Sequence, residues 1–273
     1  MVLFFSVNTS AQGDEDKVYS TNEATLIGAG KYFLKDTYLS PLKYDGYGIS
    51  VLNERMKIIK LGGGKVSRQQ LLNVDLSSSL NPAETVRTLS GFVDYSLGYH
   101  YRLTPMRNMR VLVGSSAQGE AGFIYNTRNG NNPASAKLGL NLNASALVLY
   151  TFKIKNYPIT LRYQLESPFM GVAFSPQYGQ SYYEIFSLGN NDGVVQFTSF
   201  HNQLAFRNYA TVDLPVGNFT IRTGIMNNSN RMTLNGIKTN VISNSFMIGF
   251  VREFISFGGK KQHNNALLNS AYY

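Results

Sequence analysis

Residues 137–166 read KLGLNLNASALVLYTFKIKNYPITLRYQLE, and this stretch decides the fold. Apolar and polar side chains alternate along it, with Leu147 and Leu149 as the exceptions. A period of two residues is typical of a β-strand that has one apolar and one polar face. After a short break at Lys155 the alternation restarts and continues to Glu166. The stretch therefore predicts two consecutive strands, the first of them unusually long.

The polar face of these strands carries Arg162, Gln164 and Glu166, which is too charged for the core side of a sandwich. In a membrane β-barrel, alternate residues face lipid and a polar lumen. The mean hydropathy of −0.16 excludes a helical membrane protein, and no segment has the ~18–20 apolar residues of a spanning helix. We therefore expect an all-β fold, an up-and-down antiparallel transmembrane β-barrel.

About ten strands are expected, and twelve are the alternative if residues 169–188 form a further hairpin. The ten are 24–35, 44–58, 67–79, 86–103, 108–119, 136–154, 158–166, 195–213, 218–227 and 236–256. Short turns alternate with the longer connections 36–43, 80–85, 120–135, 167–194 and 228–235. Short turns face the periplasm in outer-membrane barrels, and an even strand number leaves both termini there.

The ends of the chain differ in composition from the barrel, which we assign to 23–257. Residues 1–11 have a short apolar run followed by small side chains, as in the remnant of a secretory signal peptide, although a disordered apolar start is the alternative. Residues 12–22 are expected to be a flexible periplasmic lead-in, and residues 258–273 a flexible tail. Export together with a barrel indicates the bacterial outer membrane.

The amino-acid composition limits the kinds of covalent link and of binding partner that the chain can have. The chain has no cysteine, which excludes disulfides and a lipoprotein anchor, and its 18 Tyr and 17 Phe can supply interfacial belts.

The net charge of +9 is concentrated around the short turns. The basic residues there are Lys57, Lys60, Lys65, Arg68, Arg102, Arg107, Arg110, Lys153 and Lys155. They can meet lipid phosphates or simply keep the turns solvated. Outer-membrane lipids and lipopolysaccharide are the expected partners, with another envelope protein as a further candidate and no nucleic acid, because the charge forms no single patch.

Strand alternation places a cluster of charges in the lumen. Its expected members are Asp75, Asp94, Arg162, Glu166, His201, Arg207 and Arg222, accompanied by Gln164 and Gln203, with Arg110 and Glu54 as further candidates. Charges inside a narrow lumen must pair or stay hydrated. One interpretation is a salt-bridged, closed interior. The other is a constricted, porin-like pathway, in which Arg162, Arg207 and Arg222 form a row that attracts small anions.

An enzymatic interpretation finds little support. Ser199 and His201 are two residues apart and could form a hydroxyl–imidazole pair, with Glu166 or Asp192 to orient the imidazole. These are weak catalytic candidates, because any serine-rich strand supplies such a pair. No metal-ligand spacing and no glycine-rich phosphate loop stand out, so neither a metal nor a cofactor is expected.

The connection 167–194 is unusually aromatic for a solvated loop. Its candidate contact residues are Phe169, Phe174, Tyr178, Tyr182, Tyr183 and Phe186. Such a loop can fold into the barrel mouth as a lid or bind a partner. The third possibility is that residues 181–188 extend a strand above the membrane.

Two segments are distinctive: LKDTYLSP at 34–41, followed by YDG at 44–46 and by Glu54-Arg55, and GVAFSPQYGQSYYEIF at 171–186. They resemble segments of uncharacterised outer-membrane barrels of Bacteroides-like bacteria. The resemblance spans most of 24–257 and implies the same compartment and fold. It implies no catalytic residue.

Three hypotheses about function follow. The first is a non-enzymatic barrel, structural or accessory to an envelope complex, whose loop 167–194 is the contact surface. The second is a narrow channel for small solutes, anions included, gated by that loop. The third is a membrane-embedded hydrolase that uses His201.

Overall fold

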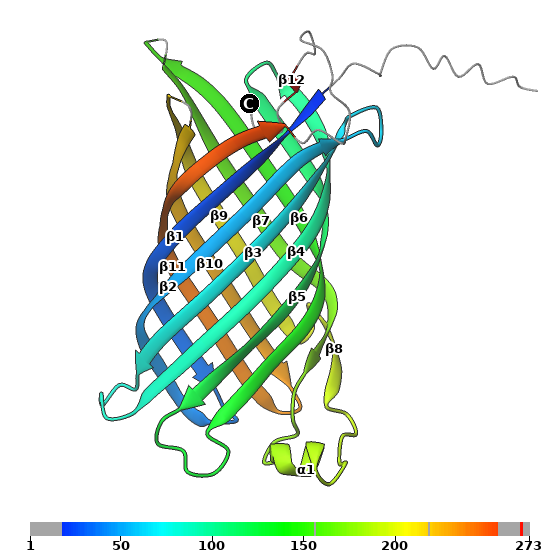
Figure 1. Ribbon diagram of the computed structural model, residues 1–273. Helices are drawn as coiled ribbons and strands as arrows, with labels where there is room; N and C mark the ends of the chain where they lie inside the picture. Colours follow the sequence, from blue (N-terminus) through cyan, green and yellow to red (C-terminus); the bar gives the residue numbers. More distant parts are fainter. Residues whose placement is uncertain (1–17, 156, 218, 256–267, 270–273) are drawn as a thin grey trace, which may run out of the picture.

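The computed structural model describes residues 18–155, 157–217, 219–255, 268 and 269. It forms a tall, closed β-barrel with both ends of the described chain at the same end (Figure 1). The expected signal remnant at 1–11 and most of the tail 258–273 lie outside the described residues. Residues 18–22, expected in a flexible lead-in, belong to the first strand.

Twelve strands and one short helix make up the described chain. They are β1 (Val18–Asp36), β2 (Ser40–Ile59), β3 (Val66–Leu80), β4 (Arg87–Met106), β5 (Met109–Asn126), β6 (Ala134–Ile154), β7 (Tyr157–Phe174), α1 (Tyr182–Phe186), β8 (Val195–Ser199), β9 (Gln203–Val216), β10 (Phe219–Leu234), β11 (Ile237–Ile255) and β12 (Leu268–Asn269). Each barrel strand pairs antiparallel with its neighbours, and β1 pairs with β11 to close the ring.

The ring contains ten strand positions within the described residues, as predicted. β8 pairs with β7 beyond the point where β9 leaves it, so β8 and β9 occupy one position in succession. Residues 169–188 form no further hairpin inside the barrel, and the twelve-strand alternative is wrong. β12 pairs with only two residues at the start of β1 and stands outside the ring.

The strands are strongly tilted. Following the pairings once around the ring from the end of β11 returns to β11 about a dozen residues earlier, near Ser243. A stagger of this size accompanies the strand tilt of about 35–45° that barrels require. The tilt brings residues far apart in the sequence to the same height in the lumen.

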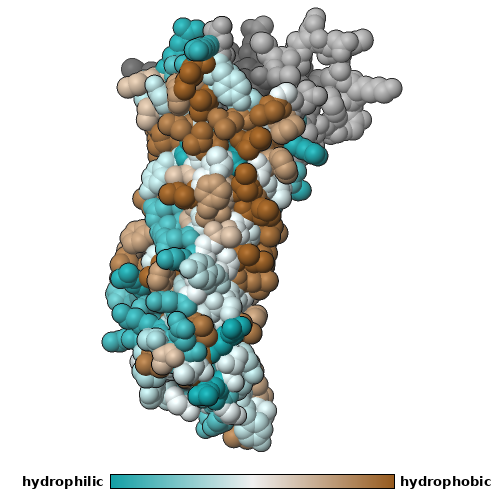
Figure 2. Space-filling view, turned by 90° about the vertical axis from the view of Figure 1, so that its left-hand side faces the viewer, coloured by the Kyte–Doolittle hydropathy of each residue, from teal (hydrophilic) through white to brown (hydrophobic). Residues whose placement is uncertain are grey.

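The predicted register of β6 is confirmed. Leu138, Leu140 and Leu142 point outward with 42–64% of their surface exposed, while Asn143 and Ser145 are buried inside. On the side of β1 and β11, hydrophobic side chains gather toward the end that carries the termini, and hydrophilic ones gather toward the opposite end (Figure 2). We call these the terminal end and the loop end. Membrane barrels separate lipid-facing and water-facing surface in this way.

At the loop end, several strands continue past their predicted limits. β5 ends at Asn126, β7 at Phe174 and β10 at Leu234, several residues later than expected. The predicted loops 120–135 and 228–235 therefore shrink to 127–133 and 235–236. Small and amide side chains weaken the apolar alternation there, although backbone pairing continues. No helix in the described chain is long and apolar enough to span a membrane.

Candidate functional site

An ion-pair network crosses the lumen in the terminal half, and we call Glu54, Arg162, Asp213 and Arg222 the inner plug. Glu54 accepts a hydrogen bond from Arg162 Nη2, and its Oε2 lies 2.9 Å from Arg222 Nη1. Asp213 accepts from Nε and Nη2 of Arg222 at 2.7 Å each. The guanidinium carbon of Arg162 lies 4.7 Å from the centre of the Tyr209 ring. The two arginines therefore share one carboxylate.

The inner plug is neutral and excludes solvent. Its two carboxylates balance its two guanidiniums, and all four side chains are 0% exposed. Gln69 donates to Glu54 and to Gln164, and Gln164 donates back to Gln69 at 2.8 Å. Buried aliphatic side chains surround the network: Met56, Ile58, Leu71, Leu112, Leu147 and Leu149. Leu147 and Leu149, which broke the alternation in the sequence, point inward because they belong to this packing.

A cavity of about 100 Å³ lies nearer the loop end, and we call it the acidic cavity. Its charged lining consists of the carboxylates Asp75, Asp94, Glu120 and Glu166 and the cations Lys137 and Arg207. Arg207 forms an ion pair with Asp94 and a longer one of 3.5 Å with Glu166. Asp75 accepts a hydrogen bond of 2.6 Å from the Tyr32 hydroxyl. The carboxylates outnumber the cations, so the formal charge of this part of the lumen is negative.

At the loop end of the acidic cavity, Lys137 turns toward the mouth of the barrel. Its Nζ lies 2.7 Å from Asp36 Oδ2 and 3.0 Å from Thr239 Oγ1. β6, which carries Lys137, and β1, which carries Asp36, lie five positions apart in the ring of ten, on opposite sides of the lumen. This ion pair therefore spans the mouth and takes Lys137 away from the four cavity carboxylates.

Most of the expected lumen charges lie inside, but the arginines are paired. Arg162, Arg207 and Arg222 come from neighbouring strands, as the sequence suggested, and each is matched by carboxylates. The acidic cavity, which Arg207 lines, is bordered by a carboxylate excess instead. The arrangement therefore does not favour the small anions that a row of free arginines would attract.

His201 is not a lumen residue, and this prediction was wrong. It lies exposed in the turn between β8 and β9, with its ring stacked on Phe197. The turn at 200–202 interrupts the strand, so the two-residue alternation does not carry across it. Its Nδ1 is 2.6 Å from Ser199 Oγ, but no carboxylate in the described chain is hydrogen-bonded to the imidazole. Glu166, an expected orienting group, is bound to Arg207 instead.

Several charged residues of the lumen were not predicted from the sequence pattern. Asp213 ends a predicted strand and has the same parity as Arg207, which would have placed it inside. Asp36 and Glu120 fell in predicted loops, because their strands continue farther than the hydropathy pattern shows. Among the described residues, no group of histidines and carboxylates has the arrangement of a metal site.

Four aromatic side chains meet at the loop end, and we call them the aromatic cap. Tyr182 and Phe186 belong to loop 175–194, Phe174 ends β7, and Tyr38 lies in the turn between β1 and β2. Phe174, Tyr182 and Phe186 stack on one another with ring centres 6.2–6.3 Å apart, and Tyr38 meets the Tyr182 ring edge-on. The Tyr38 hydroxyl donates to the Gln180 carbonyl at 2.8 Å. The cap therefore joins the long loop to the turn between β1 and β2.

The helix α1 orients the cap. Ser181 accepts from the Glu184 amide while the Glu184 carboxylate accepts from the Ser181 amide, which is a complete capping box. These hydrogen bonds lower the pKa of Glu184. Burial raises the pKa of Tyr38 to about 12 and also raises the pKa of Tyr182. Residues 181–188 do not extend a strand, so that alternative was wrong.

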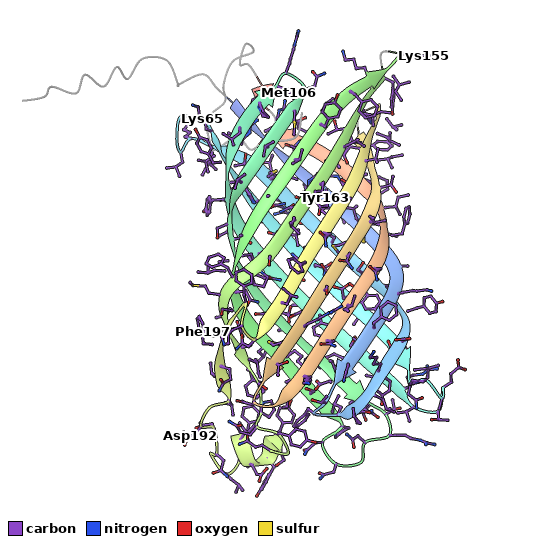
Figure 3. The ribbon with its side chains drawn as sticks, turned by 180° about the vertical axis from the view of Figure 1, so that it is seen from behind. Lys65, Met106, Lys155, Tyr163, Asp192 and Phe197 are labelled. Carbon is purple, nitrogen blue, oxygen red and sulfur yellow. The ribbon has the colours of Figure 1, made fainter. Side chains whose placement is uncertain are left out.

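The six candidate contact residues of the loop have different positions. Phe169 is the extra residue of a β-bulge in β7, and Phe174 and Tyr182 are partly buried within the cap. Tyr178, Tyr183 and Phe186 are 65–72% exposed. Asp192 lies on the same loop, and Phe197 points away from the barrel wall (Figure 3). The loop therefore has a docked side and a free side.

The fold is similar to outer-membrane barrels of known structure. The outer membrane protease OmpT from Escherichia coli matches with a TM-score of 0.51 at 8% identity, over 88% of this chain and 98% of that one. The translocator domain of the autotransporter NalP from Neisseria meningitidis gives 0.43 at 12% identity, over 88% and 90%. An outer membrane channel from Pseudomonas putida F1 gives 0.35 at 9%, over 89% and 99%.

At 8% identity the likeness to OmpT establishes the outer-membrane β-barrel fold alone, since fold does not fix function. No curated protein matches the sequence. A family model described as a protein of unknown function, DUF3316, matches residues 1–261. The chain belongs to this DUF3316 family.

Proposed function

We propose that this protein is a non-enzymatic outer-membrane β-barrel, with both termini in the periplasm, that presents loop 175–194 to a partner in the cell envelope. The observation that carries the proposal is the free side of the loop, where Tyr178, Tyr183, Phe186 and Leu188 are 57–72% exposed. Exposed aromatic clusters on ordered loops are typical of interaction surfaces. The inner plug supports a structural role, because it fills the lumen.

Outer-membrane lipids and lipopolysaccharide are the proposed surroundings of the barrel wall. The outward leucines of β6 supply an apolar surface, and Lys57, Lys65 and Arg68 lie close to the terminal end. Basic side chains at that level can reach lipid phosphates of the inner leaflet. The likeness to Bacteroides-like barrels adds the expectation of a similar bacterial source.

The contact surface can be tested by site-specific photo-cross-linking in native membranes. A cross-linker at Phe186 should give one adduct of reproducible mass, and the double variant with Tyr183→Ser should lose it. Tyr47 on β2 is the matched control, since it is 70% exposed and belongs to the barrel wall rather than to the loop. A cross-linker there should give no such adduct. The proposal is wrong if position 186 gives no adduct or gives the same products as position 47.

The orientation can be tested separately, because the chain has no cysteine. Ser187→Cys places a single thiol beside α1, and Lys65→Cys places one in the turn between β2 and β3. A membrane-impermeant maleimide should label position 187 on intact cells and position 65 only after permeabilisation. The reverse pattern would place the termini outside.

A second candidate is a narrow channel gated by the loop, and the acidic cavity favours cations as its solute. Because the inner plug fills the lumen, planar-bilayer conductance should then rise, with cation selectivity, only when deletion of residues 175–194 is combined with Glu54→Gln, which removes the shared carboxylate of the plug. Conductance at baseline in the parent and in the combined variant would exclude the channel. The hydrolase hypothesis has no comparable support. An ester turnover that is unchanged in His201→Ala would exclude it.

A further inference from the structure

A second hollow lies at the terminal end of the lumen, and we call it the terminal vestibule. Its volume is about 480 Å³, within the range of small-molecule sites. Leu149 and Val251 form its buried apolar side, and both belong to the packing around the inner plug. Because the plug fills the lumen behind them, the vestibule is a blind pocket that opens at the end carrying the short turns.

Arg110 is the half-buried charged residue of the vestibule lining, whose other charged residues, Arg107 and Glu253, are exposed. It is the second residue of β5, is half-buried, and shares the inward parity of Leu112, which is 0% exposed. Within the described part of the chain, no carboxylate lies within ion-pair distance of its guanidinium. This contrasts with Arg162 and Arg222 of the inner plug and Arg207 of the acidic cavity, each of which has a carboxylate partner. A half-buried cation without a counter-ion is costly unless water or an anion supplies its hydrogen bonds.

The vestibule also offers neutral hydrogen-bond donors. Thr151 and Thr160 lie side by side with their hydroxyl oxygens 3.0 Å apart, so one of the two hydrogens is left to donate elsewhere. Asn108 and Thr220 line the same hollow. The lining carboxylate, Glu253, accepts a hydrogen bond from Ser20. A ligand anion is therefore directed toward Arg110 and away from Glu253.

We propose that the terminal vestibule binds an oxyanion, a carboxylate or a phosphate, carried on a short apolar body. Arg110 holds the anionic group through the two-pronged geometry that guanidinium offers to such groups. Phe219, Pro158 and Pro215 contact the apolar body, with Leu149 and Val251 beneath it. This site is independent of the aromatic cap, which lies at the opposite end of the barrel.

Calorimetric titration of the full chain in a neutral detergent tests the site. Hexanoate and butyl phosphate are the two probes, and hexanol is the uncharged control. At least one anion should bind saturably, hexanol should not, and Arg110→Gln should weaken the binding by roughly tenfold or more. Arg68→Gln, on the outward face of β3, should leave it unchanged. The probe that binds identifies the head group as carboxylate or phosphate.

Chemical protection supplies a test that requires no variant. Phenylglyoxal should modify Arg110 in the unliganded protein, and the bound anion should protect it, while Arg68, which does not line the vestibule, is modified equally in both samples. Peptide mass spectrometry reads each site. The proposal is overturned if neither anion binds, if Arg110→Gln binds as well as the parent, or if the anion leaves Arg110 modification unchanged.

Discussion

In the inner plug two carboxylates face two guanidiniums, whereas in the acidic cavity four carboxylates line the space and only Asp94 and Glu166 pair with a cation of the described chain, Arg207. The plug side chains have no contact with solvent, and aliphatic side chains surround them. The cavity keeps room for water beside its charges. Buried charges persist only when they are paired, and hydrated charges tolerate imbalance. The comparison indicates that the plug determines the rigidity of the barrel and the cavity determines the electrostatic potential of the lumen.

Removal of the shared carboxylate in the plug should have the largest effect. Glu54→Gln leaves Arg162 without its carboxylate and Arg222 with Asp213 alone, and should cost about 3–5 kcal/mol of unfolding free energy. Urea-dependent unfolding in lipid vesicles measures it. Glu23→Gln is the matched control, because the Glu23–Arg55 pair is 2.8 Å long but partly exposed. The control should change stability by less than about 1 kcal/mol. Equal losses in both variants would contradict the role of the plug.

The second test contrasts lipid with the cavity at adjacent residues. Leu142→Arg places a charge on the outward face and should cost about 2–4 kcal/mol. Asn143→Arg points into the acidic cavity, where carboxylates can pair with it, and should cost less. The same unfolding measurement serves both variants. Similar losses would mean that the inside and outside of β6 are wrongly assigned.

A smaller effect is expected from the cavity itself. Asp94→Asn removes one partner of Arg207 but leaves Glu166, so the loss should be about 1–3 kcal/mol, below that of Glu54→Gln. A loss as large as that of Glu54→Gln would show that the two regions are equally dry.

The smallest expected effect concerns the aromatic cap and leaves the barrel intact. Burial raises the pKa of Tyr38 to about 12, from an ordinary value near 10, so Tyr38 keeps its proton to a higher pH when the loop is docked on it than when the loop is undocked. Docking should be fully stable below about pH 10 and weaken as the pH rises toward 12. Limited proteolysis should then cut within 175–194 at pH 11 but not at pH 8. Tyr38→Phe should reduce this difference, and cleavage that does not depend on pH would refute it.

The fold could be predicted from the sequence because one face of each strand must meet lipid. That constraint fixed the ten-strand barrel and the inward placement of Arg162 and Arg222. The pairing was not predictable, because Glu54 meets Arg162 across the lumen and no local pattern encodes the stagger of the ring. His201 was misplaced because a turn reset the alternation, and the α1 helix was missed because five residues carry too little periodicity.

The crossing ion pairs also bear on how the barrel is assembled. Glu54 on β2 and Arg162 on β7 lie five strands apart, as do Asp36 on β1 and Lys137 on β6. In an open sheet, in which neighbouring strands have paired but β1 and β11 have not, these charges would lie far from their partners. The pairing of β1 with β11 and these ion pairs therefore support one another, because both hold distant parts of the sheet in the closed ring.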